Sequence, residues 1–189
     1  MIDYQQEIER TVTHLKAGKV ILYPTDTIWG LGCDATNSKA VERIFEIKQR
    51  PSNKSLIVLV DSVEMLRNYV KDMPDIAVDL ILKSSTPLSI IYDEGKNLAK
   101  NISSDKSICI RVVRNEFCQE IIRRLGKPIT STSANLSGEP SSLTFNDISK
   151  KILEGTDYTV QLYHDILTKP KSSTIIKLHR DNTFDIIRQ

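Results

Sequence analysis

Hydrophobic residues along this chain alternate between helical spacing and short apolar runs. Ile8, Val12 and Leu15 recur at helical spacing within residues 4–17, which predicts an amphipathic helix that Gly18 ends. The apolar run at 19–23 then predicts a buried strand closed by Pro24. Because the same two patterns follow each other along the rest of the chain, helices and strands are expected to interleave.

The later elements follow from the same rules of spacing. Further helices are predicted at 38–48, 62–69, 75–82, 116–125 and 146–153. Further strands are predicted at 56–60, 88–92, 107–113, 128–131, 160–163, 173–178 and 184–187. Turn-rich segments at 25–34 and 132–142 follow two of the strands. This order is typical of the α/β class, with some antiparallel pairing where two strands follow closely.

Length and charge narrow the class of protein. A chain of 189 residues, 40% hydrophobic and 26% charged, fits one globular domain over residues 1–189. Its 26 basic and 24 acidic residues are too balanced to indicate nucleic acid by themselves. We expect neither a signal peptide nor a membrane span, because no apolar run approaches the ~20 residues that a span needs.

The cysteines and histidines point to no metal centre. Cys33, Cys109 and Cys118 match no zinc or redox spacing, so three reduced, buried thiols and a cytoplasmic location are predicted. None of the three histidines has metal-ligand spacing to another histidine or to a cysteine. No zinc site made of protein side chains is therefore predicted, and the sequence leaves open whether protein side chains hold Mg²⁺.

The first candidate for chemistry is the segment 23–32, Tyr-Pro-Thr-Asp-Thr-Ile-Trp-Gly-Leu-Gly. It follows a buried strand, and ligands in open α/β sheets bind near strand ends. A plain turn capped by Thr25 or Asp26 explains the same residues. Thr25 and Thr27 are alternate residues of an extended segment, so either or both can face a ligand.

The second candidate is a group of cations at 48–54. Lys48, Arg50 and Lys54 lie at the end of a predicted helix and in the loop after it. Cations there are often solvated and favoured by the helix dipole. The functional alternative is a polyphosphate clamp, because the planar fork of arginine and the mobile charge of lysine both suit phosphate oxygens.

The third candidate is the segment 130–142, where hydroxyl side chains and Asn135 crowd one loop. Such a loop can surround a nucleotide with hydroxyls and backbone amides, or it can be a flexible Ser/Thr loop. A fourth segment, 171–176, indicates only hydroxyls that enter a strand. The chain has no P-loop, no Rossmann glycine pattern and no nucleophile motif. These residue types suit a protein that binds and positions reactive small molecules.

Taken together, these segments resemble the YrdC-type threonylcarbamoyl-adenylate synthases. The resemblance rests on 23–32, on Lys48-x-Arg50-Pro51 and on Ser-Ala-Asn-x-Ser-Gly at 133–138, in that order. Arg111 before the third block and Ser-Thr at 173–174 after it also match, so the resemblance runs from about residue 8 to 188. Asp26, Trp29 and Ser172 depart from the Glu, Tyr and Glu that the family usually carries.

The resemblance implies a twisted mixed sheet flanked by helices around a concave basic cavity. It implies that threonine, bicarbonate and ATP, with Mg²⁺, give threonylcarbamoyl-AMP and pyrophosphate. Downstream proteins then transfer the group to tRNA next to the anticodon. Contact with tRNA or double-stranded RNA is a further implication.

The resemblance also implies roles for individual residues. Lys48 and Arg50 are expected to be catalytic. The expected threonine-binding residues are Thr27, Arg111, Ser131 and Ser173. The expected ATP-binding residues are Arg50, Lys54, Ser107, Ser133, Asn135, Ser141 and Arg188.

Two other functions fit parts of the pattern. A module of the same fold could bind RNA without catalysis, although the near-neutral charge counts against strong sequence-independent affinity. The chain could also handle carbamoyl groups as in hydrogenase maturation, but those proteins carry zinc-finger segments and no C-x-x-C pair occurs here.

Overall fold

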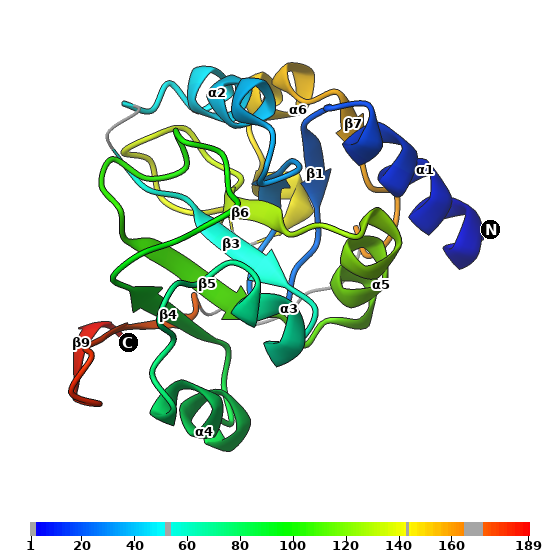
Figure 1. The fold of residues 1–189 in the computed structure, drawn as a ribbon. Helices are drawn as coiled ribbons and strands as arrows, with labels where there is room; N and C mark the ends of the chain where they lie inside the picture. Colours follow the sequence, from blue (N-terminus) through cyan, green and yellow to red (C-terminus); the bar gives the residue numbers. More distant parts are fainter. Residues whose placement is uncertain (1–2, 52–53, 143, 165–171) are drawn as a thin grey trace.

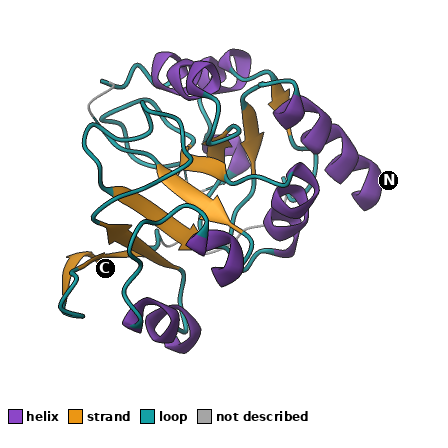
Figure 2. Cartoon of the chain, viewed as in Figure 1, coloured by secondary structure: helices purple, strands orange, loops and turns teal. Residues whose placement is uncertain are grey.

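The strands of the protein form one mixed sheet in the computed structural model shown in Figures 1 and 2. The structure describes residues 3–51, 54–142, 144–164 and 172–189. The strands are β1 (Ile21–Tyr23), β2 (Gly30–Gly32), β3 (Ile57–Val60), β4 (Leu88–Tyr92), β5 (Ile108–Val112), β6 (Ile129–Ser133), β7 (Tyr158–Thr159), β8 (Thr174–Leu178) and β9 (Phe184–Arg188). Their order across the sheet is β7-β1-β2-β6-β3-β5-β4-β8-β9. The pairs β1/β7, β3/β5 and β4/β8 are parallel and the other neighbours are antiparallel, which confirms the predicted α/β class with a mixed sheet.

Helices flank this sheet. They are α1 (Tyr4–Lys16), α2 (Ser38–Ile47), α3 (Val63–Arg67), α4 (Ile76–Lys83), α5 (Glu116–Leu125) and α6 (Lys150–Gly155), with a short 3-10 helix at Phe145–Asp147. In Figure 1, α1 lies beside α5 and α2 beside α6, and each of these pairs is in contact. Residues of β3 alternate between two apolar clusters, with Val58 and Val60 in one and Leu59 in the other. The sheet therefore has a core on each face.

The helix ends follow the expected capping chemistry. The Asn37 side chain accepts hydrogen bonds from the backbone N–H groups of Lys39 and Ala40, so it caps α2. Gly126 has φ of 73° and ends α5 in the left-handed conformation that glycine adopts without cost. Both helices accordingly lie where their periodicity predicts them.

Strand β2 is the main difference from the sequence-based expectation, which treats 25–34 as turn. Its two glycines suggest a turn because glycine is rare in strands. At Gly32, however, a Cβ would lie 2.6 Å from the carbonyl oxygen of Thr130 and 2.6 Å from a ring carbon of Tyr23. The strand has glycine because the Tyr23 ring and β6 approach its backbone closely.

Gly32→Ala is therefore expected to destabilise the protein by about 1–3 kcal/mol. The new methyl group meets backbone on one side and a buried ring on the other, and neither can move without disturbing β1 or β6. Urea unfolding followed by circular dichroism measures the change. A stability within 0.5 kcal/mol of the parent protein would show that the packing is looser than this.

Two C-terminal predictions are also corrected. The strand expected at 160–163 is wrong. The segment that joins the sheet is β7, which lies just before it, and the chain turns away at Tyr163, where φ is 65°. The helix expected at 146–153 is a 3-10 helix followed by α6, and Ile148 between them is extended. Strand β6 also runs on to Ser133, two residues beyond its predicted end.

The three cysteines confirm the expectation of buried thiols. Cys33, Cys109 and Cys118 are free and buried, and burial raises the pKa of the Cys33 and Cys109 thiols to about 12. Every described helix is too short or too polar to span a membrane. Of the motifs discussed above, residues 52–53 and Lys171 lie outside the described residues.

Candidate active site

A cavity of about 230 Å³ opens on the face of the sheet where the hydroxyl and arginine side chains gather. It is lined by residues of segment 27–30, by residues 55–57 at the start of β3, by residues of β5, β6 and β8, and by the end of β9. The polar lining residues are Thr27, Arg50, Ser55, Arg111, Ser131, Thr132, Ser133, Ser141, Ser172, Ser173 and Arg188. Among the described residues that line it, three are arginines and none carries a carboxylate.

Strand register brings these residues to one face. Ile57 of β3 pairs with Ser131 of the antiparallel strand β6, so their side chains share a face. Arg111 follows Cys109 by two positions in β5, and Cys109 pairs with Ile57. Because side chains alternate along a strand, Arg111 projects to the same face as these residues.

The segment after β1 presents Thr27 to the cavity and keeps Thr25 behind it. Thr25 Oγ1 lies 2.9 Å from Thr27 Oγ1, donates to the carbonyl oxygen of Ile28 at 2.7 Å and accepts from the Thr27 N–H at 3.0 Å. Thr27 lines the cavity, whereas Thr25 is absent from the described lining residues. The sequence leaves open which of the two threonines faces a ligand. In the structure, Thr27 is the one that faces the cavity.

Arg111 is a buried cation with a carboxylate beside it. Its side chain is 3% exposed, and Nη2 lies 3.0 Å from Oδ1 of Asp26, an ion pair that lacks the angle of a hydrogen bond. Nε of Arg111 has no hydrogen-bond partner among the described residues. Asp26 Oδ2 also accepts the backbone N–H of Arg114 at 3.3 Å. Asp26 thus anchors one nitrogen of the guanidinium while another remains available to a ligand.

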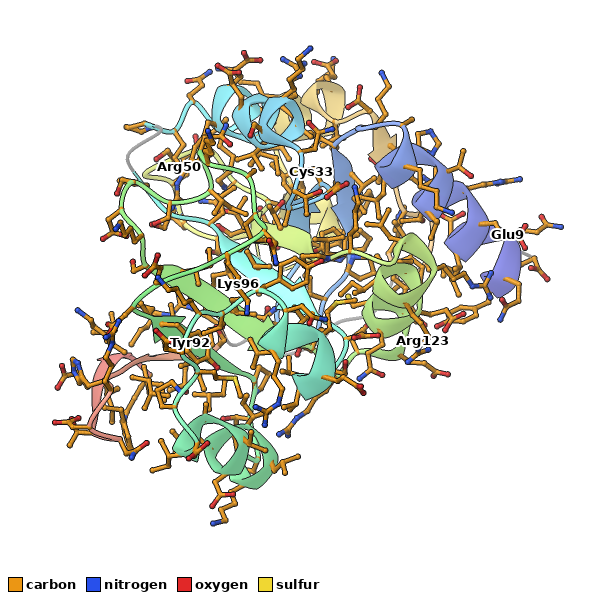
Figure 3. The ribbon with its side chains drawn as sticks, in the orientation of Figure 1. Glu9, Cys33, Arg50, Tyr92, Lys96 and Arg123 are labelled. Carbon is orange, nitrogen blue, oxygen red and sulfur yellow. The ribbon has the colours of Figure 1, made fainter. Side chains whose placement is uncertain are left out.

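Arg50, labelled in Figure 3, follows α2 and lines the cavity. Its backbone N–H donates to the carbonyl oxygen of Phe45 at 2.9 Å, and Nη2 donates to that of Ser55 at 2.8 Å. Nε has no hydrogen-bond partner among the described residues, and burial lowers the pKa of Arg50. The guanidinium is therefore positioned, yet it keeps donor capacity for an anion.

The C-terminal strand supplies the third arginine. Arg188 Nη2 donates to the carbonyl oxygen of Ser173 at 2.9 Å, and Nε donates to the same oxygen at 3.2 Å. Ser173 Oγ lies 2.9 Å from Ser89 Oγ of β4. These contacts connect β9, β8 and β4 at the edge of the cavity.

Lys48 and Asn135 lie behind the cavity wall. The Lys48 side chain is buried, and Nζ donates to the backbone carbonyl oxygens of Ser133 and Asn135. Burial, with Arg50 nearby as a second cause, lowers the pKa of Lys48 to about 8. The Asn135 amide donates to the carbonyl oxygens of Leu136 and Glu139, while its Oδ1 has no hydrogen-bond partner among the described residues.

The structure therefore brings together most of the predicted site residues. Those that line the cavity are Thr27, Arg50, Arg111, Ser131, Ser133, Ser141, Ser173 and Arg188. Lys48 and Asn135 shape the 133–137 loop from behind. Lys54 is exposed, and Ser107 Oγ donates to Asp105 beside a second hollow formed by residues 94–108. Neither residue is among the described residues that line the main cavity.

Besides Ser55, Thr132 and Ser172, which line the cavity, the sequence leaves Asp26 and Trp29 without a role in the site. Asp26 reads in the sequence as a turn residue or a departure from a family pattern, and its pairing with Arg111 joins residues 85 positions apart. Trp29 lines the cavity and stands against the ring of Phe145, with ring centroids 4.9 Å apart. The signal available in the sequence was that both lie in the same post-strand segment as Thr27.

Trp29 is expected to report ligand binding by its fluorescence. It is the single tryptophan of the chain and it lines the cavity, so a charged ligand there should change its emission intensity or wavelength. Titration with ATP and with threonine measures the change. Trp29→Phe is the control that should abolish the signal, and an unchanged spectrum at saturating ATP would argue against a nucleotide in this cavity.

No group of three or more histidine, cysteine, aspartate or glutamate side chains that could hold a metal is found in residues 3–51, 54–142, 144–164 and 172–189. The site offers guanidinium groups, hydroxyls and amides instead. It is suited to binding anions rather than to coordinating a metal with protein carboxylates.

Comparison with known proteins identifies the family. The family model Sua5/YciO/YrdC, described as "Telomere recombination", matches residues 13–189. The chain belongs to the Sua5/YciO/YrdC family. This confirms the family resemblance seen in the sequence.

Individual members of the Sua5/YciO/YrdC family agree with this assignment. A threonylcarbamoyl-AMP synthase from Pseudoalteromonas translucida is 36% identical over 160 residues, which cover 82% of this chain and 86% of that protein. The crystal structure of E. coli YciO has a TM-score of 0.81 and 28% identity and covers 98% of this chain and 89% of its own.

A structure of P. abyssi Sua5 with L-threonine has a TM-score of 0.82 and 27% identity. It covers 94% of this chain, but this chain spans only 52% of that protein. The shared part is thus about half of P. abyssi Sua5, and it is the half that corresponds to the fold described above.

Proposed function

We propose that this protein is a threonylcarbamoyl-AMP synthase, which makes threonylcarbamoyl-AMP and pyrophosphate from L-threonine, bicarbonate and ATP. The observation that carries the proposal is the single cavity in which Arg50, Arg111 and Arg188 converge with hydroxyl side chains. The names of the relatives support the same activity. They favour it over an RNA-binding module without catalysis.

The proposed reaction joins three small molecules in two steps. The threonine amine, once it has lost a proton, attacks the carbon of bicarbonate, and water leaves as the carbamate forms. A carbamate oxygen then attacks the α-phosphorus of ATP, and the bond to the β-phosphate breaks to release pyrophosphate. Negative charge grows on the leaving phosphates, so fixed guanidinium groups lower the barrier.

The threonine end of the cavity is proposed to be the Arg111 side. The unpartnered Nε of Arg111 would donate to the threonine carboxylate, with Asp26 holding the guanidinium in place. Thr27, Ser131 and Ser173 would offer hydroxyls to the rest of the amino acid. That a Sua5 protein binds L-threonine supports this arrangement.

The nucleotide end is proposed to be the side of Arg50, Ser133, Ser141 and Arg188. Mg²⁺, carried with the phosphates, would be held by oxygen atoms, since oxygens are its preferred ligands. Asn135 Oδ1 is buried and has no hydrogen-bond partner among the described residues, but Asn135 does not line the cavity, so it would reach such an ion only if its side chain turned toward the phosphates. When bound, the ion would neutralise phosphate charge. Lys54 and Ser107 do not line the described cavity, so any contact between them and ATP would lie outside it.

The wider setting is part of the same proposal. Residues 1–189 would act as one domain in the cytoplasm, where thiols such as Cys33 stay reduced. The labile product would pass to proteins that modify tRNA next to the anticodon. Direct contact with tRNA or double-stranded RNA is tested by a gel-shift titration at two salt concentrations, because phosphate contacts weaken as salt rises.

The deciding experiment uses the purified protein without RNA. It is incubated with ATP, threonine and labelled bicarbonate, and the products are separated. Label in an adenylate, together with threonine-dependent release of pyrophosphate, is expected. Pyrophosphate release that does not need threonine, or an absence of label in the adenylate, would contradict the proposal.

A further inference from the structure

Lys48 connects α2 to the loop at 133–137 by three contacts. Its Nζ donates to the carbonyl oxygen of Ser133 and to that of Asn135, the latter at 2.6 Å. Its own carbonyl oxygen accepts the backbone N–H of Ser137 at 2.9 Å. The residue is only 1% exposed. Two of the three N–H donors of its ammonium group are therefore used on backbone rather than left toward the cavity.

The loop that Lys48 contacts sets two serines of the cavity. Ser133 lines the cavity at the start of the loop and Ser141 lines it near the end. Between them, the Asn135 amide donates to the carbonyl oxygen of Glu139 at 2.7 Å, and Ser142 Oγ donates to that of Ala134 at 3.1 Å. The loop is thus held by both side-chain and backbone hydrogen bonds, and Lys48, which caps α2, supplies two of them with its ammonium group.

The arrangement also explains why a cation is buried here. No carboxylate forms an ion pair with Lys48 among the described residues. Two carbonyl oxygens take its place and offset part of the cost of removing the ammonium group from water. A hydrophobic side chain could fill this space, but it would leave both carbonyl oxygens without the donor that they have now.

We infer that Lys48 is a positioning residue, which holds the 133–137 loop so that Ser133 and Ser141 face the nucleotide, and that it does not contact the substrates itself. The effect on ATP binding rests on the proposed function. The effect on the loop does not, because the contacts are present in the protein without ligand. The two parts can therefore be tested separately.

The first test is amide hydrogen exchange of the ligand-free protein, in Lys48→Met, in Lys48→Gln and in the control Lys39→Met. Lys39 lies exposed on the same helix. In Lys48→Met, amides within 133–142 are expected to exchange about 10- to 100-fold faster, as for a lost hydrogen bond to a charged group. Lys48→Gln keeps an N–H donor and should give a smaller increase. Lys39→Met should match the parent protein.

The second test compares the KM for ATP in Lys48→Met, Ser133→Ala and the double variant. If Lys48 acts through the loop, Ser133→Ala adds little once Lys48 is gone, so the two effects are not additive. Unchanged exchange of 133–142 in Lys48→Met and in Lys48→Gln, with a raised KM for ATP, would overturn the inference and make Lys48 a direct ligand. If the parent protein forms no adenylate, the proposed function fails. The hydrogen-exchange result would still decide whether Lys48 holds the 133–137 loop.

Discussion

Arg111→Ala is expected to lose about 3–5 kcal/mol of stability, because it leaves the Asp26 carboxylate buried without its cation. The pair is 3.0 Å apart and both side chains are at most one tenth exposed. Under the proposed function, the same change removes the Nε donor for the threonine carboxylate. The kcat/KM for threonine should therefore fall about 10- to 100-fold, since a hydrogen bond between charged groups is lost.

A double variant separates the two effects of Arg111→Ala. Adding Asp26→Asn removes the stranded charge, so urea unfolding should show a recovery of stability, whereas pyrophosphate release should stay low. Arg123→Ala is the control, because Arg123 forms an exposed pair with Glu120, and such pairs contribute little to stability. Recovery of activity in the double variant would mean that Arg111 supports the fold and does not bind threonine.

Arg50→Ala is expected to reduce adenylate formation by about 100- to 1000-fold, as for loss of a donor that stabilises charge in a transition state. Little stability should be lost, because the half-buried side chain gives up one hydrogen bond, from Nη2 to the carbonyl oxygen of Ser55. Arg50→Lys keeps the charge but not the planar fork, so its activity should lie between that of the parent protein and that of Arg50→Ala. Threonine-dependent pyrophosphate release measures each variant.

The control for Arg50 is Arg43→Ala. Arg43 lies on the exposed side of α2, where its Nη1 pairs with Glu46 at 3.0 Å. Its loss should leave the rate unchanged within about twofold, because exposed pairs contribute little. An Arg50→Ala protein as active as Arg43→Ala would remove Arg50 from the proposed phosphate-binding end of the cavity.

Helix periodicity and capping were readable from the sequence alone because they depend on near neighbours. The spacing of Ile8, Val12 and Leu15 predicts α1, and Asn37 caps α2 as its residue type suggests. Most strands were also predicted, since short apolar runs between turn residues are a local signal. The blocks at 23–32, 48–51 and 133–138 were enough to indicate the family.

Strand β2 and the inward position of Lys48 could not be predicted in this way. Gly32 belongs to a strand only because Tyr23 and Thr130 approach it, and Lys48 points to a loop 85 residues further along the chain. The sequence leaves two alternatives for Lys48, a solvated cation favoured by the helix dipole or part of a polyphosphate clamp, and neither places its ammonium group against the backbone of the 133–137 loop.

By itself, then, the sequence determined which elements form, which class of fold they build and which residue types are available for chemistry. The tertiary structure decided which of those residues meet: Arg111 with Asp26, Lys48 with the 133–137 loop, and three arginines around one cavity. The physical reason is distance along the chain. Helix and turn preferences act over a few residues, whereas strand register and buried polar contacts join residues that only folding brings together.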